Sequence, residues 1–174
     1  MSPMAFGNYG YGSASHLLGM LLSREAGLDV EPVPFNGTRQ FISELIAGRL
    51  CFGFIDAGSA RAFIRNGPLR PLGSTGSRRA PDLPDLPTLR ELGMTSLDPQ
   101  IWQGMLLPSG TLPAIVAAIG RAMGEAVRRP GTTNLIRSVG YEPVGSTPEE
   151  FAAMIAHDAP IWRRIINETG VRIR

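Results

Sequence analysis

Helical and strand-like patterns alternate at short intervals through the first hundred residues, and this alternation constrains the fold more than any other feature of the sequence. Apolar residues with helical spacing follow Ser13 and Thr38, whereas residues 50–55 form an uninterrupted apolar run. Alternating strands and helices favour a parallel sheet, because parallel strands need a long crossover between them. We expect strands at 30–35, 50–55 and 69–74, and helices at 13–27, 38–48 and 59–66.

A proline-rich stretch at 78–87 interrupts this pattern, and longer elements follow it. Its three prolines lack the backbone N–H that helices and sheets use, so we expect a surface excursion. Apolar spacing then predicts a short helix, a strand, two helices and a last helix that Pro160 should kink or split. These elements are expected at 88–92, 100–107, 112–127, 132–139 and from 147 onward. The predicted domains are 1–98 and 99–174.

The composition excludes several kinds of chemistry. All 17 basic residues are arginines, which rules out Schiff-base lysines, phosphate-loop lysines and Ser-x-x-Lys nucleophiles. Arginines and acids are interspersed, with a formal net charge of +2 and 7% aromatic residues, so we predict no nucleic-acid partner. The two histidines and the single Cys51 lack the spacing of a metal site. We therefore expect neither a metal nor a cofactor.

Membrane and export signals are weak in the sequence. No apolar run approaches the roughly 20 residues that a membrane-spanning helix needs. Residues 1–6 lack the charged-then-apolar order of a signal peptide. From the residues alone, nothing directs the chain out of the cytoplasm.

The segment from Gly7 to His16 combines small residues with a predicted helix start. Its glycines let an anion approach the backbone, and the first N–H groups of a helix are free to bind it. Ser13 and Ser15 add hydroxyl groups. The pattern also suits an ordinary capped helix after a flexible turn, and that alternative stays open. The dinucleotide-binding fingerprint is not matched, since Ser15 stands where the third glycine belongs.

Ser13, Ser15 and His16 also suggest a serine nucleophile. Such catalysis needs an orienting acid and a strained elbow of the form Gly-x-Ser-x-Gly. The residues beside Ser13 depart from that elbow, so we interpret His16 as a capping or hydrogen-bonding residue. We assign no catalytic residue and predict that the chain is not an enzyme.

Two further polar segments follow predicted strands. Asp56 ends the most apolar strand, and Phe35-Asn36-Gly37 ends the strand before it. Ligands of open α/β sheets bind beyond the carboxyl ends of the strands, so both segments should face the same crevice as the helix start. Asp56 also suits a helix N-cap, and the two roles are compatible.

Five segments carry a family pattern in a fixed order and spacing. They are Gly10–Leu17, Val33–Gly37, Arg78–Thr88, Trp102–Thr111 and Gly140–Phe151, with Trp162 downstream. Together they resemble the periplasmic solute receptors of tripartite tricarboxylate transporters, the Bug-type family. The resemblance covers nearly the whole chain. It implies an α/β fold of the type II periplasmic-binding-protein kind, in which a parallel sheet flanked by helices forms a lobe.

The resemblance also implies the function and the site. Members enclose a small organic carboxylate, such as an amino acid, a di- or tricarboxylate or an aromatic acid, and present it to membrane transporter subunits from the periplasm. The implied ligand-binding residues are Gly12, Ser13, Ala14, Ser15, His16, Phe35, Asn36, Gly37 and Asp56. The family turn is usually Pro-Tyr-Lys-Gly, so this chain keeps the aromatic ring at position 35 without its hydroxyl and lacks the basic residue.

A further implication concerns the two parts of the chain. Residues 1–98 correspond to the ligand-binding second lobe of the family, and residues 99–174 to the returning C-terminal part of an incomplete first lobe. The helices after Pro113 would then expose apolar faces at roughly 25 cal/mol per Å². We therefore predict self-association or domain swapping. Two alternatives stay open: a remnant that folds as an oligomer without a ligand, and an enzyme that uses the same anion pocket.

Overall fold

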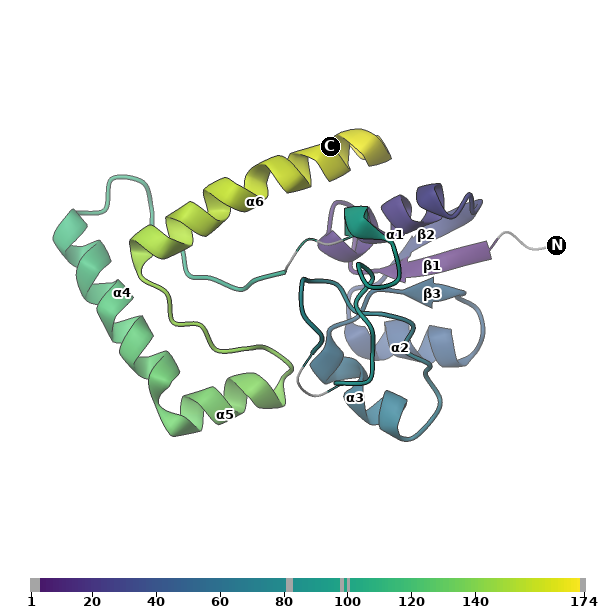
Figure 1. Cartoon of the computed structure of the whole chain (residues 1–174), viewed down its shortest axis with the longest axis horizontal. Helices are drawn as coiled ribbons and strands as arrows, with labels where there is room; N and C mark the ends of the chain where they lie inside the picture. The colour runs from purple at the N-terminus through teal and green to yellow at the C-terminus, as the bar shows by residue number, and fades with distance from the viewer. Residues whose placement is uncertain (1–3, 81–82, 98, 100, 173–174) are drawn as a thin grey trace. The chain divides into compact units, whose positions relative to one another are not determined.

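The computed structural model describes residues 4–80, 83–97, 99 and 101–172. The chain divides into two compact units, one formed by Met1–Ile101 with Ile161–Arg174 and the other by Trp102–Pro160. The first unit contains a sheet flanked by helices, and the second contains helices joined by extended segments (Figure 1).

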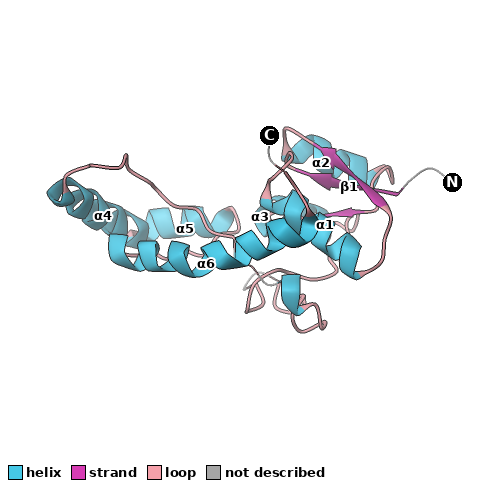
Figure 2. Ribbon diagram, turned by 90° about the horizontal axis from the view of Figure 1, so that it is seen from above, coloured by secondary structure: helices cyan, strands magenta, loops and turns pink. Residues whose placement is uncertain are grey.

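A three-stranded parallel sheet forms the centre of the first unit. Its strands are β1 (Met4–Asn8), β2 (Val30–Pro34) and β3 (Phe52–Gly53), in the order β2-β1-β3 (Figure 1). Figure 2 shows the strands in magenta among the helices. The predicted parallel sheet is confirmed, but its central strand β1 was missed. Gly7 and Asn8 belong to residue types that strands usually avoid, and they hide β1 in the sequence.

Three helices of the first unit follow the prediction closely. They are α1 (Ala14–Glu25), α2 (Thr38–Ile46) and α3 (Ala57–Arg65). The Oγ of Ser13 caps α1 by accepting a hydrogen bond from the backbone N–H of His16. Gly27 and Gly48, with φ of 63° and 71°, lie just beyond α1 and α2, where a left-handed residue ends a helix.

Glycines set how closely the helices approach the sheet. Gly7 and Gly53 are paired in the β1–β3 register, and the ring of Phe41 from α2 lies across both. On the other face of β1, the ring of Phe6 lies against Gly19 of α1, where an added Cβ would come within 2.1 Å of it. Since neighbouring residues of a strand point to opposite faces, β1 is covered by α1 on one side and α2 on the other.

A cluster of buried apolar residues joins α1 to the end of α6 (Pro148–Thr169). Its buried members are Leu17, Leu18, Leu21, Leu89, Leu97 and Ile165. The guanidinium of Arg24 donates to the backbone carbonyl of Glu168 beside this cluster. The C-terminal turns of α6 therefore complete the core on the α1 side.

Three predicted elements of the first unit are wrong or shortened. The strand expected at 50–55 is reduced to the two residues of β3. The strand expected at 69–74 is absent, and the helix expected at 88–92 is a series of turns; between them only an isolated bridge joins Ser74 to Thr88. Pro71 cannot donate to a sheet ladder, which disfavours a strand there. The strand β2 accommodates Pro32 and Pro34 because it lies at the edge of the sheet, where one side of a strand needs no donor.

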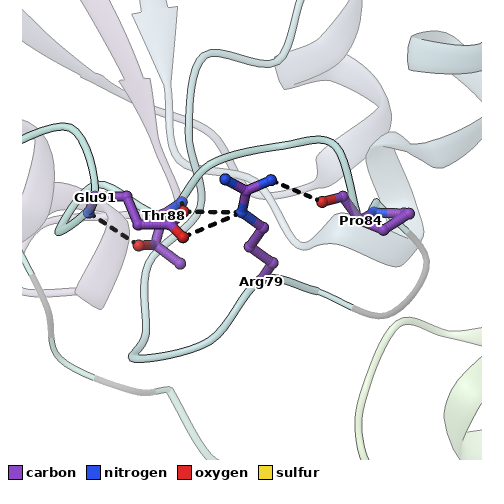
Figure 3. A network of polar contacts seen from close by, with 4 residues as sticks. All are labelled: Arg79, Pro84, Thr88 and Glu91. Atoms are coloured by element: carbon purple, nitrogen blue, oxygen red, sulfur yellow. Dashed lines mark hydrogen bonds and ion pairs between the residues drawn. The ribbon is translucent and has the colours of Figure 1, made fainter.

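The described residues of the proline-rich excursion, 78–80 and 83–87, form no helix or strand and are held by side-chain contacts (Figure 3), whereas Pro81 and Asp82 lie outside the described residues. Thr88 and Glu91 bond reciprocally, because each side-chain oxygen accepts from the other residue's backbone N–H at 3.1 and 2.8 Å. Arg79 donates from Nε to the Glu91 carboxylate at 2.9 Å and from Nη1 to the carbonyl of Pro84 at 3.1 Å. The hydrogen bond from Thr88 N–H, and then that from Arg79, lower the pKa of the Glu91 carboxyl.

The second unit contains α4 (Pro113–Arg128), α5 (Pro130–Ser138) and α6 up to Pro160. The strand expected at 100–107 is wrong for residues 101–107, which form no strand, and Gln100 lies outside the described residues. The indole N–H of Trp102 donates to Asp158 at 3.0 Å, and its ring meets Phe151 edge-on at 5.0 Å. The extended segment is thus held by α6 rather than by a sheet.

Helix α6 is continuous through Pro160, so of the two predicted effects the split is wrong and the kink stays a prediction. A proline inside a helix removes one backbone hydrogen bond at a cost of about 3 kcal/mol. The apolar residues that follow it, Ile161, Trp162 and Ile165, belong to the core cluster of the first unit. Their burial opposes this cost and keeps the helix in one piece. Among the helices that the structure describes, none is long and apolar enough to cross a membrane.

Candidate functional site

The three segments proposed as ligand-binding lie at one edge of the sheet. The loop 9–13 follows β1, residues 35–37 follow β2 and residues 54–56 follow β3, and the three strands are parallel. A backbone hydrogen bond of 2.8 Å from Phe35 N to Asn8 O joins the first two segments. From β1 the chain continues to β2 on one side of β1, and it then crosses to β3 on the other side. The strand order therefore reverses between β1 and β3, and open α/β sheets hold ligands at such a switch point.

The loop before α1 is shaped by two glycines and closed by Ser13. Gly10 and Gly12 have φ of 105° and 80°, a region that favours glycine. Ser13 bonds twice to the carbonyl of Gly10, through its backbone N–H at 3.1 Å and its hydroxyl at 2.7 Å. The predicted capped helix start is therefore present, with the serine at its N-cap.

The hydroxyl protons of both serines are used inside this loop. Ser13 donates to Gly10 O, so in its 3.0 Å contact with Ser15 the donor is the Ser15 hydroxyl. The Oγ of Ser15 in turn accepts from the backbone N–H of Tyr9 at 3.0 Å. The serines thus hold the loop in shape, and neither has a proton left for a ligand in this conformation.

The free donors are backbone groups. In the described part of the chain, the N–H groups of Ala14 and Ser15 at the first two positions of α1 donate to no acceptor. Such groups carry the positive end of the helix dipole. What the site offers an anion is therefore a pair of backbone amides.

His16 is buried beneath the loop, with 3% of its surface exposed. Its Nδ1 accepts a 3.1 Å hydrogen bond from the backbone N–H of Gly12. The ring is stacked with Phe6 and meets Tyr11 edge-on at a centroid distance of 5.2 Å. Burial lowers the pKa of His16 below its ordinary value of 6.5, so the ring is neutral at pH 7.

Asn8, the last residue of β1, was not foreseen as part of the site. It is fully buried, and its Oδ1 accepts from the backbone N–H of Gly10 at 2.9 Å. Its Nδ2 has no hydrogen-bond partner. The sequence does contain a signal for Asn8, namely a polar residue just before a glycine-rich loop. That signal points to the site only once the preceding residues are recognised as the strand β1.

The other predicted site residues lie at the same edge with unequal exposure. Phe35 is 92% buried and stacks on Phe41 with ring centroids 5.4 Å apart, so its ring belongs to the core. Asn36 and Gly37 are exposed before α2. Asp56 is exposed at the N-cap of α3 without a side-chain capping bond. Of these residues, Asn36, Gly37 and Asp56 are exposed, whereas Phe35 is not.

The geometry does not place a nucleophile beside a base. The Ser13 hydroxyl donates to Gly10 O, and the His16 Nδ1 is occupied by the N–H of Gly12. Over the described ranges, no group of three or more His, Cys, Asp or Glu residues could hold a metal ion.

Comparison with known proteins places this arrangement in context. Residues 2–171 match the sequence profile described as "Tripartite tricarboxylate transporter family receptor". The protein of the clcB-clcD intergenic region of Pseudomonas knackmussii is 31% identical over 158 residues, which cover 90% of this chain and 94% of that protein.

Two solved structures share the fold. The periplasmic binding protein BugD is 26% identical with a TM-score of 0.81, and the match covers 98% of this chain and 58% of BugD. MatC from Rhodopseudomonas palustris with bound malate is 26% identical with a TM-score of 0.80, over 94% of this chain and 56% of MatC. The chain thus spans a little more than half the length of these structures.

Proposed function

The chain belongs to the tripartite tricarboxylate transporter receptor family, and on that premise we propose that it is a solute-binding receptor that holds a small organic carboxylate at the start of α1. The observation that carries this proposal is the pair of unpaired N–H groups of Ala14 and Ser15 at the sheet edge. They lie beside the β1–β3 switch point, where the fold class collects ligands.

The chemistry of these groups favours a carboxylate over a neutral solute. Two adjacent backbone N–H groups can each donate to one oxygen of the anion, and the dipole of α1 adds roughly 0.3–1 kcal/mol. His16 is neutral at pH 7 and so brings no cation to the site. The affinity therefore comes from oriented backbone dipoles rather than from an ion pair.

The relatives support the ligand class and the cellular role. MatC, which is similar over most of this chain, binds malate, a small dicarboxylate. We propose that this chain binds a solute of that kind in the periplasm and delivers it to a tripartite transporter, without turnover of the ligand. Asn36 and Gly37 would contact the part of the solute that lies away from α1, and Asp56 would accept a hydrogen bond from a donor group such as the hydroxyl of malate.

Proline substitution at the first position of a helix tests the anion site directly. Ala14→Pro removes one proposed donor, and helices accept proline there; α4 and α5 already begin with Pro113 and Pro130. Ser13 has φ of −66° and ψ of 159°, the backbone region that a following proline requires. The matched variant is Ala57→Pro at the start of α3, whose N-cap Asp56 is also extended.

Malate binding is measured by calorimetric titration of both variants. Ala14→Pro should weaken binding by about 1.5–3 kcal/mol, the value of one hydrogen bond to a charged group, or roughly 10- to 100-fold in Kd. Ala57→Pro should bind like the unmodified chain. If only Ala57→Pro lost affinity for malate, the carboxylate site would be assigned to the start of α3 instead of α1. Failure of the unmodified chain to bind any carboxylate of a di-, tricarboxylate, amino-acid and aromatic-acid panel would favour the ligand-free remnant.

We also propose that the second unit associates with a further copy of the chain. Its exposed apolar side chains support this, because isolated exposed leucines are common but several on one unit indicate an uncovered surface. The four most exposed are Leu106, Leu112, Leu135 and Val144, at 71%, 65%, 65% and 78%.

A further inference from the structure

We infer that His16 is a positioning residue that holds the Gly10–Ser13 loop in its ligand-ready form by accepting the Gly12 N–H at Nδ1, and that only its neutral form can do so. The consequence for affinity rests on the carboxylate site proposed at α1. The consequence for the loop does not, because it concerns a hydrogen bond within the chain itself.

The ring is fixed on several sides, so its nitrogens have defined roles. Phe6 from β1 lies parallel to it at a centroid distance of 6.4 Å, and Tyr11 from the loop meets it at 87°. With Nδ1 accepting from Gly12, the ring proton must lie on Nε2. The imidazole therefore has one tautomer in the folded loop.

Protonation is incompatible with this arrangement. An imidazolium carries N–H donors at both nitrogens, so Nδ1–H would face the Gly12 N–H. Among the described residues, no carboxylate or arginine bonds to the ring from β1, the loop or α1. Nothing there would compensate the added charge, and burial already disfavours it.

Protonation of His16 should act on the loop before α1. Gly12 lies one residue before the N-cap, at a φ of 80°, and the hydrogen bond to His16 is what orients its N–H inward. When this bond breaks, Gly12 loses the contact that orients its N–H, and the loop before α1 is held only by its remaining bonds, chiefly those of Ser13 to Gly10 O. Acid should therefore weaken carboxylate binding, whereas a histidine that contacted the ligand as a cation would strengthen it.

The first test needs no ligand. Nuclear magnetic resonance of the ring nitrogens of His16 should show an unprotonated Nδ1 and a protonated Nε2 near pH 7. The Gly12 amide should be protected from exchange near pH 7, and its protection relative to the intrinsic exchange rate at each pH should fall as the histidine is protonated. A protonated Nδ1 in the folded chain at pH 7 would overturn the inference, whatever the chain binds.

The second test uses two variants and malate as the probe. His16→Asn places its Oδ1 as many bonds from Cα as Nδ1 and keeps an acceptor that does not titrate, whereas His16→Phe keeps a ring without an acceptor. Loss of one such bond should weaken binding about five- to tenfold in His16→Phe. As the pH is lowered from about 8, past the ordinary histidine pKa and through the lowered pKa of His16, affinity should fall more in the unmodified chain than in His16→Asn.

These outcomes separate failure of this inference from failure of the receptor proposal. Tighter malate binding in acid, or equal binding by His16→Phe, would refute the positioning role while leaving the site in place. Absence of malate binding at every pH, together with the expected tautomer at His16, would refute the α1 site and leave the role of His16 in the loop intact.

Discussion

The ring of Phe41 occupies the space that a side chain on Gly7 would need, since a Cβ at Gly7 would lie 2.0 Å from Cε2 of Phe41. This contact sets the distance between α2 and β1. Gly53, opposite Gly7 in β3, is restricted by the same ring at 2.2 Å.

Gly7→Ala should therefore destabilise the chain. The added methyl group would overpack the α2 side of the sheet, at a cost of about 1–3 kcal/mol. Urea unfolding measures the loss. Gly37→Ala is the control, because nothing lies within 4 Å of the added Cβ and its φ of −168° suits any residue. Equal stability of the two variants would contradict the close approach of Phe41.

Substitutions at Ser13 should separate helix capping from ligand binding. Ser13→Ala removes the N-cap of α1 and should cost about 1 kcal/mol of stability. Ser13→Asp keeps a capping oxygen and so should be more stable than Ser13→Ala. It also places a negative charge where the carboxylate is proposed to bind, so malate affinity should fall further in Ser13→Asp than in Ser13→Ala. The reverse order in affinity would count against an anion at this helix start.

Acid should loosen the proline-rich excursion through Glu91. Its carboxyl pKa is lowered below the ordinary value of 4.5, so the ionised form supports the turn above that pH and the support is lost as pH falls through the lowered pKa. Amide exchange at Thr88, whose N–H donates to Glu91, reports the change. Glu91→Gln should show faster exchange at neutral pH and a weaker dependence on acid. An unchanged acid profile in that variant would assign the effect to another group.

The proposed association of the second unit is tested by one matched pair. Leu135 in α5 and Leu72 in the first unit are exposed to 65% and 66%. Leu135→Glu should shift the chain towards monomer in native mass spectrometry, whereas Leu72→Glu should leave the oligomer unchanged. A monomeric unmodified chain at micromolar concentration would contradict self-association.

The helices of the first unit and the start of α1 could be predicted because their signals are local. Ser13 caps, Gly27 ends the helix, and the apolar spacing between them survives in the structure. The strand β1 could not be predicted, because Gly7 and Asn8 are accepted there only by their fit to α2 and to the loop. Such fits depend on residues distant in sequence.

The same limit applies within the site. Parallel strands end at one edge of a sheet, so the three segments that we propose to bind the ligand could be named together. Which groups remain free could not be foreseen, since the hydroxyls of Ser13 and Ser15 bond within the loop. The burial of Phe35 against Phe41 could not be foreseen either, and it removes an aromatic ring from the proposed site.

The position of Ile165 in the same cluster as Leu17 and Leu21 has a consequence for synthesis of the chain. Residues that lie more than 140 positions apart must meet before the α1 side of the core can close. During translation, β1, α1 and β2 emerge well before the last turns of α6, and their apolar face stays uncovered until those turns have left the ribosome. Folding of the first unit is therefore completed only after Ile165 has emerged, and chains stopped before that residue would be substrates for chaperones and proteases.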